Sequence, residues 1–177
     1  MHYLFYILGL APSFIWLAFY LRKDKHPESN WMVATTFFLG MASALVILIL
    51  ELGVQEIINY FGAKIILVAK AYSASLTSAW LLANSDWLTL LISVFFAGAV
   101  IEEYVKYRAT RFWVAKNSEL DEPLDIMLYM IIGALGFAAM ENIMVLHNQN
   151  FHEALTAQNA LVTIGWRFIS ATFLHAL

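Results

Sequence analysis

The sequence predicts an all-α protein that crosses a membrane several times, a polytopic transmembrane helical bundle. Of its 177 residues, 62% are apolar and only 13% are charged, and the mean hydropathy is +0.71. A soluble domain is about half apolar and about one quarter charged. The net charge of −3 indicates no nucleic-acid partner. We therefore expect residues 1–177 to form one membrane-embedded domain whose surroundings are the lipid bilayer.

Five apolar runs are candidates for membrane spans, because about 20 apolar residues are enough to cross a bilayer. They are Tyr3–Leu21, Trp31–Leu50, Trp87–Ile101, Leu124–Leu146 and Ala160–Leu177. A sixth stretch, Ile65–Ala83, is only moderately apolar and carries Lys70 and several hydroxyl side chains. We expect this stretch to be extracytoplasmic, interfacial or re-entrant.

Two short basic segments indicate how the chain is oriented, since lysine and arginine in short loops mark the cytoplasmic side. An even number of crossings must separate the two segments, and the second and third runs supply two. The N-terminus is then extracytoplasmic, and the protein is a multi-pass protein of the cell membrane. The basic residues are Arg22, Lys23 and Lys25 in the first segment and Lys106, Arg108, Arg111 and Lys116 in the second.

The most informative feature is the sequence Glu102-Glu103-Tyr104-Val105-Lys106 within an apolar region. Carboxylates inside a bilayer are costly, so those that occur there usually serve a function. Helical spacing lets Lys106 reach both glutamates, which would keep one ionised while the other holds a proton. The ionised one could then act as a general base toward water. The alternative is a structural ion pair between one glutamate and Lys106.

Two further apolar runs carry ionisable residues, Glu141 in one and Arg167 and His175 in the other. With a helical rise of 1.5 Å per residue, Glu141 lies about 24 Å from Asp125 at the start of its run. His175 lies about 22 Å from the start of the last run, and Glu102 lies about 21 Å from Lys116 if its helix continues that far. We therefore expect Glu102, Glu141 and His175 to share one depth.

Two polar neighbours have supporting roles. Asn142 could orient Glu141 or donate to an oxyanion, and Arg167 could be a counter-ion for a carboxylate. The chain has no cysteine, which excludes disulfides, thiolate metal sites and a cysteine nucleophile. Any metal would need histidine, aspartate or glutamate ligands, and here the set would be Glu102, Glu141 and His175.

These residues, taken in order, resemble the PrsW family of intramembrane proteases, which is similar to the glutamate-dependent clan of CAAX-processing and bacteriocin-processing enzymes. The charged turn at 22–27 resembles that family too. As a set the motifs are specific, whereas the first alone would be weak. They are Glu-Glu-x-x-Lys at 102–106, Asp-x-x-x-Tyr at 125–129, Gly-x-x-Gly-Phe-Ala-x-x-Glu-Asn at 133–142, and Arg167 with His-Ala at 175–176.

The resemblance implies a protease that cuts a membrane-anchored protein, of which an anti-sigma factor is the best-known type. The family's functional residues carry over onto Glu102, Glu103, Glu141 and His175. The family usually continues through a further helix, so either the chain is truncated at its C-terminus or the site lacks its last wall. We predict metal-free catalysis by a glutamate, with a divalent metal such as zinc as the alternative. Other functions to weigh are a non-catalytic scaffold and a proton or ion pathway.

Overall fold

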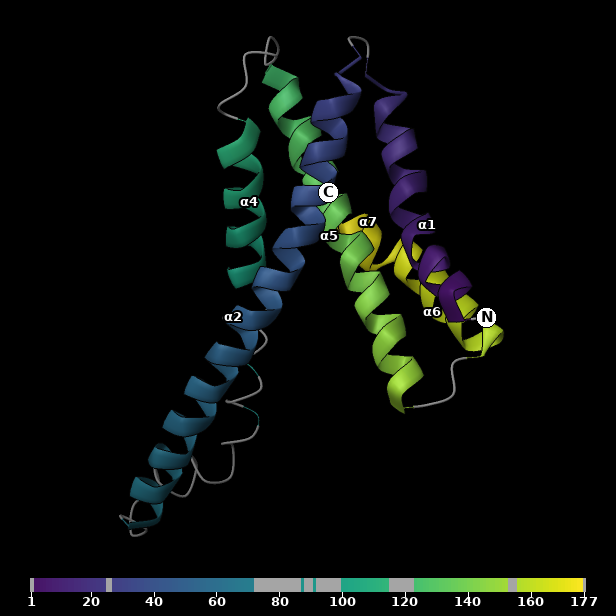
Figure 1. Ribbon diagram of the computed structural model, residues 1–177. Coiled ribbons are helices and arrows are strands. Elements are labelled where there is room, and N and C mark those ends of the chain that lie inside the picture. The colour runs from purple at the N-terminus through teal and green to yellow at the C-terminus, as the bar shows by residue number, and fades with distance from the viewer. Residues whose placement is uncertain are drawn as a thin grey trace. The chain divides into compact units, whose positions relative to one another are not determined.

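The computed structural model describes residues 2–24, 27–71, 87, 91, 100–114, 123–152 and 156–176, and every structural statement below concerns these residues. They form helices, and none of them lies in a strand, which confirms the predicted all-α class (Figure 1). The helices are α1 (His2–Leu21), α2 (Asn30–Ala71), α4 (Ile101–Val114), α5 (Pro123–His152), α6 (Ala157–Ile169) and α7 (Ala171–His175).

The chain divides into two compact units. Unit 1 comprises Met1–Leu45 and Lys106–Leu177, and unit 2 comprises Val46–Val105. The division falls inside α2 and inside α4, so each of these helices contributes to both units. Glu141, Arg167 and His175 all lie in unit 1.

Two of the described helices contain segments that are long and apolar enough to cross a membrane, Asn30–Gly62 and Leu124–Asn148, and Phe5–Leu21 is a shorter apolar helix. The boundary predicted at Leu50 is wrong, because α2 continues to Ala71 as one helix of 42 residues. No proline interrupts it. Its length is about 63 Å, which exceeds the roughly 30 Å of a bilayer core. The predicted span at 87–101 and residues 72–83 lie almost entirely outside the described residues.

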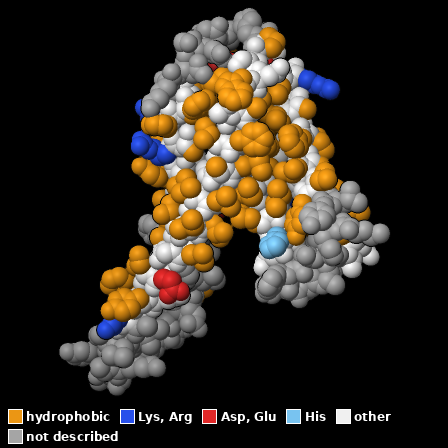
Figure 2. Space-filling view, in the orientation of Figure 1, with side chains coloured by type: hydrophobic (Ala, Val, Ile, Leu, Met, Phe, Trp, Pro, Cys, Tyr) orange, Lys and Arg blue, Asp and Glu red, His pale blue; other side chains and the backbone are white. Residues whose placement is uncertain are grey.

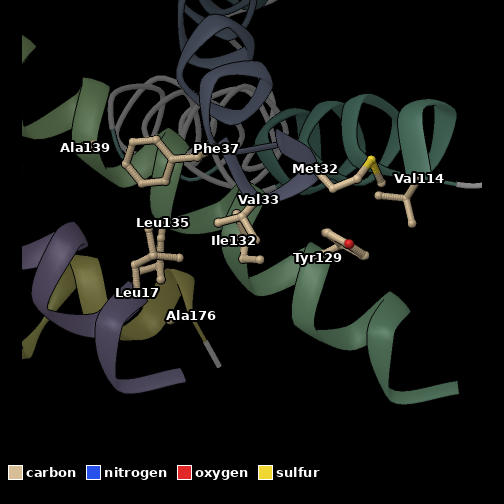
Figure 3. Packing of buried hydrophobic residues seen from close by; sticks show 10 residues of the cluster. All are labelled: Leu17, Met32, Val33, Phe37, Val114, Tyr129, Ile132, Leu135, Ala139 and Ala176. Carbon is tan, nitrogen blue, oxygen red and sulfur yellow. The ribbon is translucent and has the colours of Figure 1, made fainter. Parts of the chain in front are cut away.

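The core of unit 1 forms where α1, α2, α4 and α5 meet. Its members on α5 recur every three or four residues and so lie on one face of that helix, where they pack against side chains of the other helices (Figure 3). Burial of such apolar side chains contributes about 1.5–3 kcal/mol each in water, although between helices in lipid close packing is the main contribution. The buried members are Leu17, Met32, Val33, Phe37, Val114, Tyr129, Ile132, Leu135, Ala139 and Ala176.

Glycines let α2 approach α5 at the backbone. A Cβ atom at Gly40 would overlap the carbonyl of Gly133, and one at Gly136 would overlap the carbonyl of Phe37. A Cβ atom at Gly133 would meet the Thr110 hydroxyl of α4. Gly133 is therefore the point where three helices meet, and small residues are what allow helix backbones to approach this closely. The contact between Gly133 and Thr110 also positions the part of α4 that starts at Lys106.

The surface of unit 1 is apolar. Large hydrophobic side chains are exposed on α1, α2 and α6, among them Phe14, Phe38, Leu161 and Trp166. Figure 2 shows hydrophobic side chains spread over the face in view, with few charged ones among them. An exposed apolar surface this wide is typical of a protein that lies in lipid.

The last predicted run is broken, and this corrects the expectation of one helix over 160–177. The helix α6 ends at Ile169, and Ser170 has φ −89° and ψ −92°, outside the helical region. The Ser170 hydroxyl donates to the Trp166 carbonyl at 2.8 Å, and the Ser170 backbone N–H donates to the same oxygen at 3.0 Å. Serine hydroxyls that bond back to the preceding turn bend helices. The short helix α7 then starts in a new direction (Figure 1).

Candidate active site

A cluster of polar side chains lies beside the middle of α5, within otherwise apolar surroundings. At its centre is the Glu141 carboxylate. The Arg167 guanidinium lies 2.6 Å from Glu141 Oε2, and His175 Nε2 lies 3.1 Å from the same oxygen. Exposure of the side chains is 31% for Glu141, 17% for Arg167 and 15% for His175. The break at Ser170 is what allows both Arg167 and His175, on two different helices, to meet one carboxylate.

Lys106 extends this cluster on the far side of the imidazole. Its Nζ atom lies 3.0 Å from His175 Nδ1 and 4.6 Å from the centroid of the Phe137 ring. The same ring meets the His175 imidazole edge to face, with centroids 5.1 Å apart. Lys106 is only 6% exposed. Phe137 thus supports both the ammonium and the imidazole, and a cation over an aromatic face is attracted to it.

These contacts favour one tautomer of His175. A lysine ammonium can only donate hydrogen bonds, so the Nδ1 atom of His175 accepts from Lys106. The proton of a neutral imidazole then lies on Nε2, which donates to the Glu141 carboxylate. The arrangement favours the tautomer that carries its proton on Nε2.

Asn142 connects the cluster to its neighbours and is fully buried. Its Oδ1 atom accepts from Arg167 Nε at 2.5 Å. Its Nδ2 atom donates to the Gly9 carbonyl of α1 at 3.2 Å and to the Thr172 hydroxyl of α7 at 3.2 Å. Both amide hydrogens are therefore engaged. One side chain links three other helices and orients the guanidinium that faces Glu141.

Of the predicted site residues, unit 1 contains Lys106, Glu141, Asn142, Arg167 and His175, and the structure brings all five together. Glu102 and Glu103 lie in the first turn of α4 and belong to unit 2. Their place beside the cluster stays a prediction. The prediction that their helix runs unbroken past Arg111 is confirmed, since α4 ends at Val114.

Sequence reasoning missed two residues that accept hydrogen bonds from Asn142: Gly9 and Thr172. Thr172 is a hydroxyl residue in an apolar run, which is a weak signal for an internal hydrogen bond. Gly9 contributes only its carbonyl oxygen, which no sequence pattern marks.

The donors that unit 1 supplies by itself are too few for a zinc site. A zinc site takes about three protein ligands, and the described cluster supplies one imidazole and one carboxylate. A histidine that ligates through Nε2 normally donates its other N–H to an acceptor. Here His175 Nδ1 faces the Lys106 ammonium, which is a donor. Ligation through Nδ1 would require Lys106 to leave, and a divalent ion at Glu141 would meet Arg167.

Comparison with known sequences gives one family. Residues 28–177 match the family model described as the PrsW family intramembrane metalloprotease. The chain is 26% identical over 138 residues to Protease PrsW of Oceanobacillus iheyensis, covering 78% of this chain and 52% of the relative.

Two further relatives are Protease PrsW of Geobacillus kaustophilus and of Bacillus subtilis. Both are 27% identical to this chain, over 138 and 139 residues respectively. Each match covers 78% of this chain, and the two matches cover 50% and 51% of the relatives' own lengths. The chain therefore spans about half the length of the curated relatives it matches. No solved structure matches. The family model covers most of the chain, and the chain belongs to the PrsW family of intramembrane metalloproteases.

Proposed function

We propose that this protein is an intramembrane protease that hydrolyses a peptide bond of a membrane-anchored protein with water activated by a glutamate. The observation that carries the proposal is the continuous contact from Lys106 through His175 and Glu141 to Arg167. A non-catalytic helical bundle gains little from such a cluster, because polar groups within a membrane are costly unless they are used.

Glu102 is the general base of this mechanism, and Glu103 is the residue that takes over if the two exchange roles. The base removes a proton from water, and the hydroxide oxygen attacks the scissile carbonyl carbon. The C–N bond then breaks, and the protonated glutamate returns the proton to the leaving amine nitrogen. Each step conserves the proton, so no cofactor is needed for the balance.

His175 polarises the scissile carbonyl in this scheme. Its Nε2–H, which donates to Glu141 in the free protein, transfers its hydrogen bond to the carbonyl oxygen of the substrate. Arg167 stays with Glu141 and keeps the carboxylate ionised. A positioned donor at the developing oxyanion contributes about 2.7–4 kcal/mol to the rate. Asn142 has no amide hydrogen left for this purpose, so we assign it to the positioning of Arg167.

The proposed environment is the cell membrane, with an extracytoplasmic N-terminus and the two units acting as one domain. The core cluster supports this orientation, since Met32 near the start of α2 and Val114 at the end of α4 both pack near Tyr129 (Figure 3). The turn after α1 and the end of α4 thus lie at one end of unit 1. Arg22 and Lys23 follow α1 directly and Arg111 lies in the last turn of α4, next to that end, whereas Lys106 lies in the polar cluster. The proposed substrate is a single-pass membrane protein of the anti-sigma-factor type.

Co-expression with candidate single-pass substrates tests the function. Wild-type protein should produce a shortened substrate, whereas the Glu141→Gln and His175→Gln variants should not. The matched control is Glu56→Gln, which changes an exposed glutamate of α2. Equal cleavage by wild type and both variants would exclude the proposed site. Proton conductance without cleavage would indicate a pathway, and stable capture of the substrate without cleavage would indicate a scaffold.

A further inference from the structure

The helix that carries His175, α7, is too short to keep its position without contacts from other helices. It has only five residues, Ala171–His175, and follows directly on the break at Ser170. Helices this short are not stable by themselves, because nucleation is costly and few hydrogen bonds follow it. A contact from another helix must therefore fix the direction of α7 and the orientation of the imidazole.

Trp16 of α1 contacts the chain on both sides of the break. Its indole N–H donates to the Phe168 carbonyl at 3.2 Å, which is one of the last carbonyls of α6 and lacks a full set of helical partners. Its ring lies 5.5 Å from the Phe168 ring at an interplanar angle of 24°, and 4.9 Å from the Phe173 ring at 34°. One side chain therefore holds the end of α6 and the middle of α7.

Tyr20 lies one turn further along the same face of α1. Its hydroxyl donates to the Ala176 carbonyl at 3.3 Å, immediately after His175. The indole of Trp16 and the hydroxyl of Tyr20 thus bracket the histidine from its two sides in the chain. Leu17, between them, is buried in the core with Ala176.

We infer that Trp16 and Tyr20 are positioning residues, which hold α7 so that His175 Nε2 meets Glu141 while Nδ1 meets Lys106. Both residues lie before residue 28, where the match to the family begins. The role is defined by the orientation of the imidazole, and its effect on cleavage rests on the proposed function. An imidazole displaced by about 1 Å can cost about 100-fold in rate.

Nuclear magnetic resonance of ¹⁵N-histidine-labelled full chain in lipid nanodiscs tests the inference without a substrate. The His175 signals are identified by their loss in His175→Gln. Wild-type protein should show neutral His175 with its proton on Nε2. The double variant Trp16→Phe, Tyr20→Phe removes one N–H and one O–H but keeps both rings, and it should show a mixture of the two tautomers. Trp166→Phe and Tyr60→Phe change residues that are 73% and 61% exposed, and they should match wild type.

Enzyme kinetics provide a second measurement. With a cleavable substrate, the double variant should lower kcat by about 10- to 100-fold with little change in KM, whereas both controls keep wild-type values. Unchanged His175 signals in a folded double variant would overturn the inference, whatever the activity. If the double variant does not fold, Tyr20→Phe alone decides, because it removes a single hydroxyl and should still shift the His175 signals. If the double variant shifts the His175 signals as expected but the wild-type protein cleaves no substrate, the proposed function is refuted and the inference stands.

Discussion

The Nε2 atom of His175 lies 3.1 Å from the Glu141 carboxylate, although the two residues belong to different helices. Lys106 faces the opposite ring nitrogen. The imidazole is thus held between a donor on one side and an acceptor on the other, so that a single tautomer satisfies both. A histidine fixed in this way is ready to donate from Nε2, as the proposed mechanism requires.

Glu102→Gln should abolish cleavage while expression and folding stay unchanged. The substitution keeps the size of the side chain but removes the ionisable oxygen that a general base needs. Substrate cleavage in membranes is the measurement, with Glu56→Gln as the control. Full activity of Glu102→Gln would exclude Glu102 as the base and transfer the role to Glu103.

Arg167→Met should destabilise unit 1 by about 1–3 kcal/mol, because Glu141 would lose its counter-ion in a partly buried position. The second substitution Glu141→Gln, added to Arg167→Met, should recover part of that loss because no charge is left unpaired. The midpoints of thermal unfolding of the wild type, both single variants and the double variant give the coupling. Additive effects of the two substitutions would show that the ion pair is not what stabilises this region.

Gly136→Ala should also destabilise the protein, by about 1–3 kcal/mol, as other overpacked cores do. The new Cβ atom would overlap the Phe37 carbonyl, and backbone cannot move aside cheaply. Gly53→Ala is the matched control, since no atom lies within 4 Å of a Cβ at that position. That control should be neutral or gain up to about 1 kcal/mol from higher helix propensity. Equal unfolding midpoints for the two variants would contradict the close approach of α2 and α5.

The sequence was sufficient to predict the helical class and the members of the cluster in unit 1. Ionisable residues are so rare in apolar helices that Glu141, Arg167 and His175 stood out without any structural information. The small residues between Gly133 and Ala139 are likewise a local signal of a close helix contact. These signals are local, and local signals can be read from one sequence.

The break at Ser170 and the role of α1 could not be predicted in this way. Serine occurs within regular helices as well as at bends, and only its bond back to the Trp166 carbonyl distinguishes the two. Trp16 acts through its contact with Phe168 and Phe173, which lie far away in the sequence. The depth estimate for His175 assumed a straight helix, and the contact with Glu141 arises by a bend instead.

Metal removal tests the chemistry of the site. The contact of Lys106 with His175 Nδ1 leaves no acceptor for a metal-bound imidazole, so strong chelators should leave cleavage unchanged. Activity should instead fall at acid pH, as the general base becomes protonated. Elemental analysis and a chelation series are the measurements. About one equivalent of zinc in the purified protein, with activity lost on chelation and restored by zinc, would refute the metal-free mechanism.

The last prediction concerns Glu28, in the turn between α1 and α2. Burial raises the pKa of its carboxyl above the ordinary value of 4.5; a hydrogen bond from the Tyr129 hydroxyl opposes the shift, and the neighbouring Asp125 and Asp24 add to it. An acid whose pKa is raised by folding binds more protons in the folded state than in the unfolded state. The stability it contributes is therefore complete below pH 4.5 and is lost as the pH rises through the higher folded pKa.

Glu28→Gln should consequently raise the unfolding midpoint at neutral pH and leave it unchanged below pH 4.5. A glutamine oxygen can still accept the hydrogen bond from Tyr129, so the substitution removes the charge and little else. The change should be small, because the carboxyl is only partly buried. Thermal unfolding of wild type and Glu28→Gln across pH 4 to 8 measures the difference, with Glu56→Gln as the control. A variant that is less stable than wild type at neutral pH would show that the Glu28 charge stabilises the turn, contrary to the direction of its pKa shift.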